Sequence, residues 1–224
     1  MTMNARDITS EFPVAASRNG QSIYNRFFKR GLDIVLAVVL LPLLLPVIAV
    51  LFVLVRRDGG PGIYGHQRLG RGGQPFVCYK LRTMAVNAEA LLEDLLASDP
   101  EARREWDDSH KLKDDPRVTR LGRFLRKTSL DELPQLFNVL KGDMSLVGPR
   151  PIVRDELARY GSAAWAYLEL RPGITGKWQV SGRNDVTYDE RVELDLRYNR
   201  EVCLVCDLSI LARTAKVLLF PTGY

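Results

Sequence analysis

The feature that most constrains this chain is an apolar segment from Ile34 to Val55 that contains no charged residue. Its 22 residues, each rising about 1.5 Å in a helix, are long enough to cross a hydrocarbon layer about 30 Å thick. The segment starts too far from the N-terminus for a signal peptide, is too long for one, and lacks a small-residue cleavage site. We therefore expect it to stay in the mature protein as a membrane segment.

Both ends of this segment carry positive charge. Lys29 and Arg30 precede it, and Arg56 and Arg57 follow it. Positive residues normally mark the cytoplasmic side of a membrane, so both ends are expected on that side. This pattern does not suit a helix that spans the membrane once.

Two prolines interrupt the segment, at Pro42 and Pro46. Each lacks an N–H and frees the carbonyl four residues back, which weakens the helix there. With the flanking charges, this favours a re-entrant helix-hairpin over residues 23–57, broken at these prolines. An ordinary kinked span stays open, because prolines occur in membrane helices. A span would place either the N-terminal tail or the basic domain outside, and an exported domain would expose three cysteines to oxidation.

The composition suits a single domain beside the membrane segment. The chain has 224 residues, of which 46% are hydrophobic and 26% are charged. We expect a flexible tail over residues 1–22 and one domain over residues 58–224. Three cysteines do not form a disulfide framework, which favours a reducing compartment. The net charge of +5 suits an anionic substrate, an anionic lipid or a nucleic acid equally well.

The patterning of this domain predicts an α+β fold that is mostly helical. Residues 63–68 and 76–84 flank a glycine-rich turn and are expected to form a small β-hairpin. Residues 86–96 have helical spacing, and the charged residues 101–113 are expected to connect to the next element. Residues 201–220 carry Leu204, Leu208, Leu211, Ala215 and Leu218 on one stripe, which predicts a C-terminal amphipathic helix at the core or the membrane surface.

The stretch from Arg126 to Asp143 is the richest in chemistry. Ser129 and Glu132 have the S-x-x-E spacing of a capping box, and Pro134 and Gly142 suit the start and end of a helix. This pattern places Asp131 in the first turn. There the helix dipole favours a charged, nucleophilic carboxylate and can also hold phosphate.

Asp131 and Glu132 point about 100° apart on a helix, which makes them a poor glycosidase pair. One could attack phosphorus while the other helps to hold a metal. Alternatively, the two carboxylates only cap the helix. The surroundings favour a site, because several rigid or glycine-opened turns nearby present an arginine, the natural fork for phosphate. The candidate phosphate contacts are Lys80, Arg126, Arg150, Arg171 and Arg183.

Other known anion and hydrolase motifs are absent from the sequence. Residues 173–177 read G-x-x-G-K and do not make a Walker loop, and no G-x-G-x-x-G follows an expected strand. No G-x-S-x-G or H-E-x-x-H occurs either. ATP hydrolysis and Rossmann cofactors are therefore not expected.

From about Lys29 to the C-terminus the sequence resembles the bacterial sugar transferases, the small monotopic phosphoglycosyl transferases. It looks most like the exopolysaccharide-initiating undecaprenyl-phosphate galactose or glucose phosphotransferases. The matching motifs, in chain order, are Lys29-Arg30, Tyr79 to Met84, Ser129 to Gln135, Lys141 to Ser145, Gly148 to Pro151, Arg171 to Gly176 and Ser181 to Asn184.

The resemblance implies a catalytic domain on the cytoplasmic face of the bacterial inner membrane. There Asp131 attacks the sugar-bearing phosphate of a UDP-sugar, releases UMP and forms a covalent phosphosugar. Undecaprenyl phosphate then accepts the sugar-phosphate. The resemblance also implies Mg²⁺, with Asp131 and Glu132 as metal residues, and membrane lipid as a partner. One departure from the family is Lys177, where an apolar residue is usual; it either contacts substrate or reaches solvent.

Two other functions remain open from the residues alone. A non-catalytic membrane scaffold would suit the apolar segment, although a scaffold has no need of the carboxylate pair. A nucleic-acid binder would suit the positive charge, but no reader motif supports it, so no nucleic acid is expected. A homodimer is compatible with the sequence, but no residue indicates one.

Overall fold

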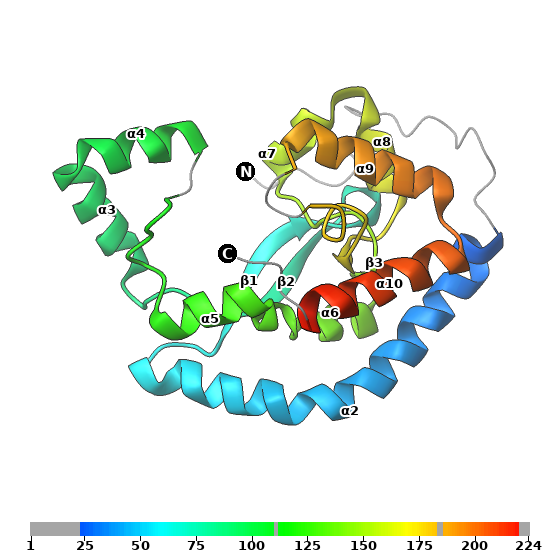
Figure 1. The fold of residues 1–224 in the computed structure, drawn as a ribbon, viewed down its shortest axis with the longest axis horizontal. Helices are drawn as coiled ribbons and strands as arrows, with labels where there is room; N and C mark the ends of the chain where they lie inside the picture. Colours follow the sequence, from blue (N-terminus) through cyan, green and yellow to red (C-terminus); the bar gives the residue numbers. More distant parts are fainter. Residues whose placement is uncertain (1–22, 110–111, 183–185, 220–224) are drawn as a thin grey trace.

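The computed structural model describes residues 23–109, 112–182 and 186–219 (Figure 1). The expected tail, residues 1–22, lies outside them. The helices are α2 (Lys29–Val55), α3 (Ala88–Ser98), α4 (Pro100–Ser109), α5 (Arg120–Thr128), α6 (Gln135–Lys141), α7 (Arg154–Leu157), α8 (Ala164–Glu169), α9 (Tyr188–Glu201) and α10 (Leu204–Leu219). The strands are β1 (Ile63–Leu69), β2 (Pro75–Leu81), β3 (Ser145–Val147) and β4 (Gly173–Thr175). The expected α+β class is confirmed.

The apolar segment forms one continuous helix, α2, which contains both Pro42 and Pro46. Figure 1 shows it curving along one side of the molecule, in keeping with the backbone hydrogen bonds that the prolines remove. The expected hairpin of two helices joined by a turn is not seen, because the helix continues through both prolines. Among the described residues, α2 alone is long and apolar enough to cross a membrane.

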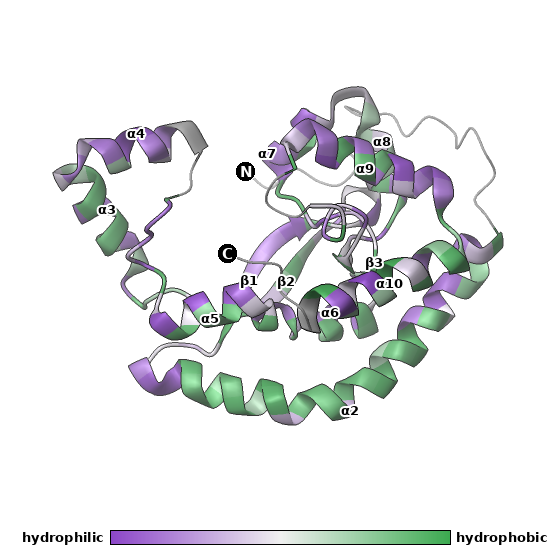
Figure 2. Ribbon diagram, viewed as in Figure 1, coloured by the Kyte–Doolittle hydropathy of each residue, from purple (hydrophilic) through white to green (hydrophobic). Residues whose placement is uncertain are grey.

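Most of the apolar surface of α2 is not covered by protein (Figure 2). Val35, Leu43 and Val53 are more than half exposed, whereas Ala37 and Ile48 on the inner side are buried. Burying such a surface in lipid is favourable, since apolar area is then removed from water. One face of α2 thus packs on the protein and the rest is free to face a bilayer.

A buried polar cluster holds the start of α2 against the C-terminal helices. Lys29 Nζ lies 2.7 Å from Asp207 Oδ2. Asp207 also accepts hydrogen bonds from the Tyr24 hydroxyl at 2.7 Å and from the Tyr198 hydroxyl at 2.6 Å. Farther along α2, Asp33 accepts the backbone N–H of Leu146 at 3.0 Å. Because buried charges need partners, these contacts fix the position of α2.

The expected β-hairpin is confirmed as the antiparallel pair β1–β2, with Ile63 opposite Leu81. Its turn contains Gly72 and Gly73, both with positive φ, where residues with a Cβ are disfavoured. The helix expected at residues 86–96 is α3. The charged connection at residues 101–113 is largely a second helix, α4, and the α3–α4 pair stands apart from the rest of the molecule in Figure 1.

A second, parallel pair joins β3 to β4, with Ser145 opposite Gly173. The backbone segments that contain Gly148 and Gly173 approach each other closely. A Cβ on Gly173 would lie 2.1 Å from the backbone nitrogen of Gly148, a distance that forbids any side chain. The sequence did not predict these strands.

The C-terminal helix occupies the expected region as α10, but its amphipathic pattern is not confirmed. Leu204 and Leu208 of the predicted stripe are exposed, while Asp207 and Ile210 are buried. Ile210 joins the main core with Ala37 of α2. The packed face of α10 therefore includes a carboxylate.

Candidate active site

Asp131 and Glu132 lie in a short 3₁₀ turn, Leu130–Glu132, between α5 and α6. Ser129 ends α5 in a left-handed conformation with φ of 58°, and at the start of the 3₁₀ turn its side chain makes no capping hydrogen bond. The predicted capping box is therefore wrong. Pro134 and Gly142 do flank α6, with Gly142 at φ of 96°, so those two predictions are confirmed.

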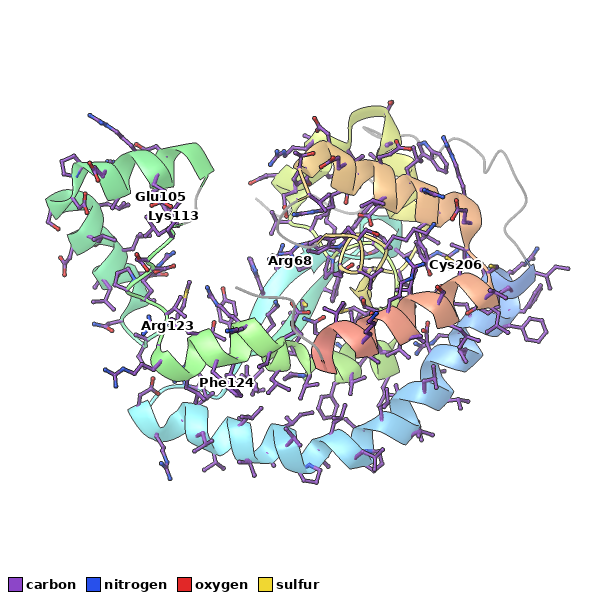
Figure 3. The ribbon with its side chains drawn as sticks, in the orientation of Figure 1. Arg68, Glu105, Lys113, Arg123, Phe124 and Cys206 are labelled. Atoms are coloured by element: carbon purple, nitrogen blue, oxygen red, sulfur yellow. The ribbon has the colours of Figure 1, made fainter. Side chains whose placement is uncertain are left out.

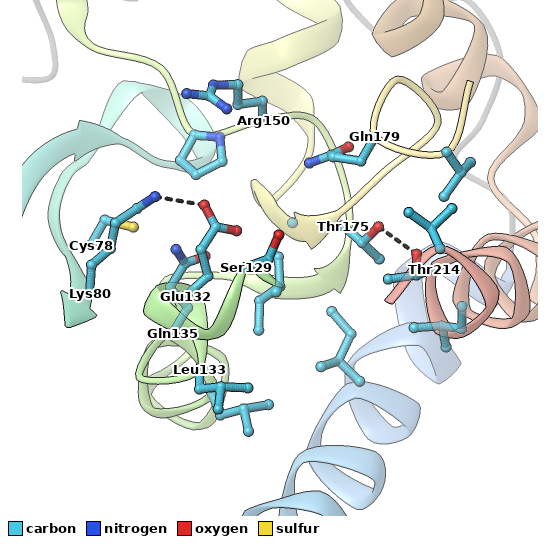
Figure 4. Close-up of a pocket in the computed structure, with 18 of the residues that line it drawn as sticks. Cys78, Lys80, Ser129, Glu132, Leu133, Gln135, Arg150, Thr175, Gln179 and Thr214 are labelled. Carbon is cyan, nitrogen blue, oxygen red and sulfur yellow. Dashed lines mark hydrogen bonds and ion pairs between the residues drawn. The ribbon is translucent and has the colours of Figure 1, made fainter. Parts of the chain in front are cut away.

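The ammonium group of Lys80 reaches both carboxylates from strand β2. Its Nζ lies 2.6 Å from Glu132 Oε1 (Figure 4). It lies 3.6 Å from Asp131 Oδ2. Lys80 and Glu132 are partly exposed, whereas Asp131 is 7% exposed. The structure thus brings together three residues that the sequence had predicted separately.

Opposing effects act on the pKa of the Asp131 carboxyl group. Burial raises its pKa above the usual value, and the charge of Glu132 raises it further. Lys80 and Arg126 lower the pKa by favouring the charged form. The result is a raised pKa at a carboxylate that faces cations, which is typical of functional carboxylates.

Three of the predicted phosphate contacts, Lys80, Arg126 and Arg150, line one cavity beside the carboxylates. Arg126 donates from Nε to the Thr83 hydroxyl at 2.9 Å. The guanidinium of Arg150 stacks over the Trp178 ring at 5.2 Å from its centre. Both arginines are therefore held in place near the carboxylate dyad, Asp131 and Glu132.

Of the other two predicted arginines, Arg171 does not line this cavity. Arg171 donates from Nε to the carbonyl of Gly142 at 2.9 Å, beside Arg30, which donates to the carbonyls of Val139 and Leu140. Arg171 thus closes the C-terminal end of α6, where cations are favoured. Arg183 lies outside the described residues.

Sequence reasoning missed Arg68 (Figure 3), which also lines the cavity. It donates to the carbonyl of Pro151 at 3.2 Å and pairs with Glu156 at 3.4 Å. The pattern of the hairpin could have indicated it. Lys80 lies opposite Tyr64, and Arg68 lies opposite Phe76. Alternate residues of a strand share a face, so Tyr64 and Arg68 lie on the same face of β1. Arg68 and Lys80 therefore belong to one face of the hairpin. Lys177 is ion-paired with Glu201 and does not line the cavity.

The cavity has a volume of about 410 Å³ and walls of two kinds. Near Lys80 and Glu132 it is polar and positively charged. Elsewhere α2 contributes Leu40 and Leu44, and α10 contributes Leu211 and Val217. A group of charged side chains thus lies next to an apolar wall that belongs partly to α2.

Two adjacent carboxylates fit a magnesium ion that is shared with a phosphate substrate. Mg²⁺ is usually bound through one or two carboxylates plus substrate phosphates and waters, without a complete protein cage. Among the described residues no group of three or more His, Cys, Asp or Glu side chains converges, so a cage for a structural metal is not formed there. Asp131 and Glu132 suit the magnesium arrangement.

The arrangement is suited to phosphoryl chemistry. A buried carboxylate can act as a nucleophile, and several fixed cations can stabilise charge on a phosphate. The nearby apolar wall adds a place for a hydrocarbon chain.

Comparisons with known proteins agree with this geometry. The family model for bacterial sugar transferases matches residues 24–221. An undecaprenyl-phosphate galactose phosphotransferase of Salmonella typhimurium is 59% identical over 199 residues, which cover 89% of this chain and 42% of that protein. The exopolysaccharide production protein ExoY of Rhizobium meliloti is 48% identical over 196 residues, 87% of each chain.

A UDP-glucose:undecaprenyl-phosphate glucose-1-phosphate transferase of Escherichia coli is 38% identical over 199 residues, which cover 85% of this chain and 40% of that protein. The chain therefore spans less than half the length of the Salmonella and Escherichia relatives, but most of the length of ExoY.

Proposed function

Because the chain belongs to the bacterial sugar transferase family, we propose that it transfers a sugar-1-phosphate from a UDP-sugar to undecaprenyl phosphate. The observation that carries this proposal is the Asp131–Glu132 pair facing Lys80 beside an apolar wall. The sugar is a hexose, galactose or glucose, since the names of relatives include both. The product would begin an exopolysaccharide, in keeping with the name of ExoY.

In the first step Asp131 is the nucleophile. A carboxylate oxygen of Asp131 forms a bond to the phosphorus that carries the sugar, and the bond from that phosphorus to the bridging oxygen of UMP breaks. The bond's electron pair leaves with UMP, and no proton has to move. Burial of Asp131 supports this role, because a poorly hydrated carboxylate is a better nucleophile.

The cations of the cavity supply the electrostatic part of catalysis. Phosphoryl transfer depends on placing positive charge around the equatorial and leaving oxygens. Lys80, Arg126 and Arg150 carry that charge, and Arg68 adds to it. Lys80 also keeps Asp131 ionised, since it lowers the pKa of that carboxyl group.

Mg²⁺ is the proposed cofactor, held by Glu132 together with Asp131. When bound, it would neutralise charge on the diphosphate of the donor. Glu132 thereby positions the donor, while Asp131 reacts with it.

In the second step the phosphate of the lipid carrier attacks the same phosphorus. The bond to Asp131 breaks, and the released carboxylate is ready for another donor. The apolar residues of α2 and α10 next to the dyad would contact the hydrocarbon part of the carrier. A two-step route lets one cavity serve a water-soluble and a lipid substrate in turn.

The membrane position follows from α2. We propose that the curved helix dips into the cytoplasmic leaflet of the bacterial inner membrane and returns to the same side. Both of its ends are positively charged, and its exposed surface is apolar. The catalytic domain would then lie on the cytoplasmic face, at the level of the lipid phosphates.

The direct test is turnover of purified protein in nanodiscs with Mg²⁺, undecaprenyl phosphate and a panel of UDP-sugars. We expect one UDP-hexose to release UMP, with turnover that needs the lipid and that Asp131→Asn abolishes. If no sugar releases UMP from folded protein, the transferase proposal fails and a non-catalytic scaffold in a polysaccharide assembly becomes the better account.

A further inference from the structure

The segment that follows β4 carries two polar side chains whose hydrogen-bonding groups have no partner within the described protein. Trp178 is 6% exposed, and its indole Nε1 is buried without an acceptor. The side-chain oxygen of Gln179 is likewise buried without a donor. Both residues line the cavity of the dyad. Since buried polar groups are almost always paired in native proteins, these two are suited to a ligand.

The direction of Gln179 supports this interpretation. Figure 4 shows its carboxamide pointing into the cavity, on the side opposite Lys80 and Glu132. The Gln179 oxygen lies close to Gly176, where a Cβ would be only 2.9 Å away, so the glycine leaves room for the amide in this position. The amide is therefore presented across the cavity from the phosphate end.

Trp178 is fixed even more firmly. Two guanidinium groups lie over its ring, that of Arg150 at 5.2 Å and that of Arg191 at 4.4 Å from the ring centre. Cations over the faces of an indole hold it by cation–π attraction. The edge of the ring, with its N–H, remains available for a hydrogen bond.

We propose, on the premise of the transferase function above, that Gln179 and Trp178 recognise the uracil base of the nucleotide donor. The Gln179 oxygen accepts the N3–H of uracil, and the Gln179 amide N–H donates to one neighbouring carbonyl. The indole N–H of Trp178 donates to the other carbonyl. Cytosine lacks the N3–H and carries an amino group in place of one carbonyl, so it leaves donors facing donors.

A base fits this wall better than a sugar does. A uracil ring is flat, largely apolar on its faces and polar along one edge. A hexose carries a hydroxyl on most carbons and needs partners all round. The neighbours of Gln179 in the cavity wall, Ile174 and Val180, are apolar, so the wall offers one polar edge between apolar surfaces.

The test measures binding of UMP and CMP by calorimetry in the presence of Mg²⁺, using the full chain in nanodiscs. We expect Gln179→Leu to weaken UMP binding about tenfold or more and to bring the UMP:CMP preference close to one, since an unpaired base edge is costly. Trp178→Phe keeps an aromatic ring but removes the indole N–H, so it should also weaken UMP binding. Lys177→Gln, in the same segment but paired with Glu201, should leave UMP binding unchanged.

The outcomes separate the inference from the function on which it rests. Unchanged UMP affinity and preference in folded Gln179→Leu protein would overturn the base-recognition proposal alone. The same holds if that variant alters only the ratio of UDP-galactose to UDP-glucose turnover, which would assign Gln179 to the sugar. A wild-type protein that neither binds UMP nor releases it would overturn both proposals.

Discussion

Two opposing effects act on the pKa of the Asp131 carboxyl group, and both bear on its proposed role as the nucleophile. Burial keeps water away and raises its pKa, while the charges of Lys80 and Arg126 lower it. A nucleophile that was fully hydrated would be less reactive, and one that was buried without cations would be protonated. The side chains around Asp131 therefore set the pH range in which it can act.

The first-step rate should fall as the pH decreases, with a midpoint above the ordinary aspartate value of 3.8. The reason is that Asp131 must be ionised to attack and its pKa is raised. Lys80→Met should move the midpoint to higher pH, because Lys80 lowers the pKa of Asp131. The measurement is single-turnover UMP release against pH, with Lys113→Met as a control. A midpoint that moves downward in Lys80→Met would contradict this account.

Arg150 and Arg171 look equivalent in the sequence, yet they should respond differently to substitution. Arg150 lines the cavity, so Arg150→Met should lower kcat/KM by about 10²-fold or more, the usual size for a lost charge-stabilising group. Arg171 closes the end of α6, so Arg171→Met should mainly lower the thermal unfolding midpoint. Steady-state kinetics and thermal denaturation of both variants would distinguish the roles. Equal loss of kcat/KM with unchanged stability would place Arg171 at the substrate instead.

At the scale of elements, the contact between α2 and α10 depends on a buried ion pair. Lys29 and Asp207 have side chains only 9% and 1% exposed. Removing one partner leaves the other charge buried and unpaired, which typically costs about 3–5 kcal/mol. This ion pair adds to the apolar packing of α2 on the domain, which includes Ala37 and Ile48.

We expect Lys29→Met to lower the free energy of unfolding by about 3–5 kcal/mol. The double variant Lys29→Met with Asp207→Leu should lose less stability than the sum of the two single variants. Chemical denaturation in detergent is the measurement. The matched control is Arg103→Ala, since the pair of Arg103 and Asp107 is exposed at 57% and 65% and contributes little. Strictly additive losses would show that the two residues do not interact.

The sequence predicted elements with strong local signals and missed those without them. The β1–β2 hairpin has alternating residues around a glycine turn, and α2 has an unbroken apolar run. Strands β3 and β4 have three residues each, too few for any periodicity. The S-x-x-E pattern at Ser129 fits a helix start, but tertiary packing made Ser129 the end of the preceding helix.

The candidate site was predicted in its residue types more than in its arrangement. Asp131, Glu132 and Lys80 lie together as their motifs suggested. Sequence patterns do not show which way an arginine in a turn faces, which is why Arg171 was assigned to phosphate. Arg68 could have been found by following the alternation of β1.

At the scale of the whole molecule, the cavity has a polar end and an apolar wall. Its polar end belongs to the hairpin and the turn between α5 and α6, and its apolar wall includes α2. The fold therefore places a phosphate reaction centre beside the path that a lipid would take. The proposed re-entrant position of α2 requires that both of its ends lie on the same side of the membrane.

That requirement can be tested with single cysteines at Ile23 and Arg57, in protein whose exposed Cys203 and partly buried Cys206 are replaced by serine. In oriented membrane vesicles, a membrane-impermeant maleimide should label both positions from the cytoplasmic side only. Labelling from opposite sides would replace the re-entrant helix with a kinked span.

The central claim is that Asp131 carries the sugar-phosphate between donor and lipid. The most direct measurement is intact-protein and peptide mass spectrometry after incubation with the UDP-hexose and Mg²⁺ but without lipid. We expect one hexose-phosphate per chain on the peptide that contains Asp131, a matching amount of UMP, and no adduct in Asp131→Asn. UMP release that occurs only with lipid present, with no adduct on the protein at any time, would contradict the two-step account.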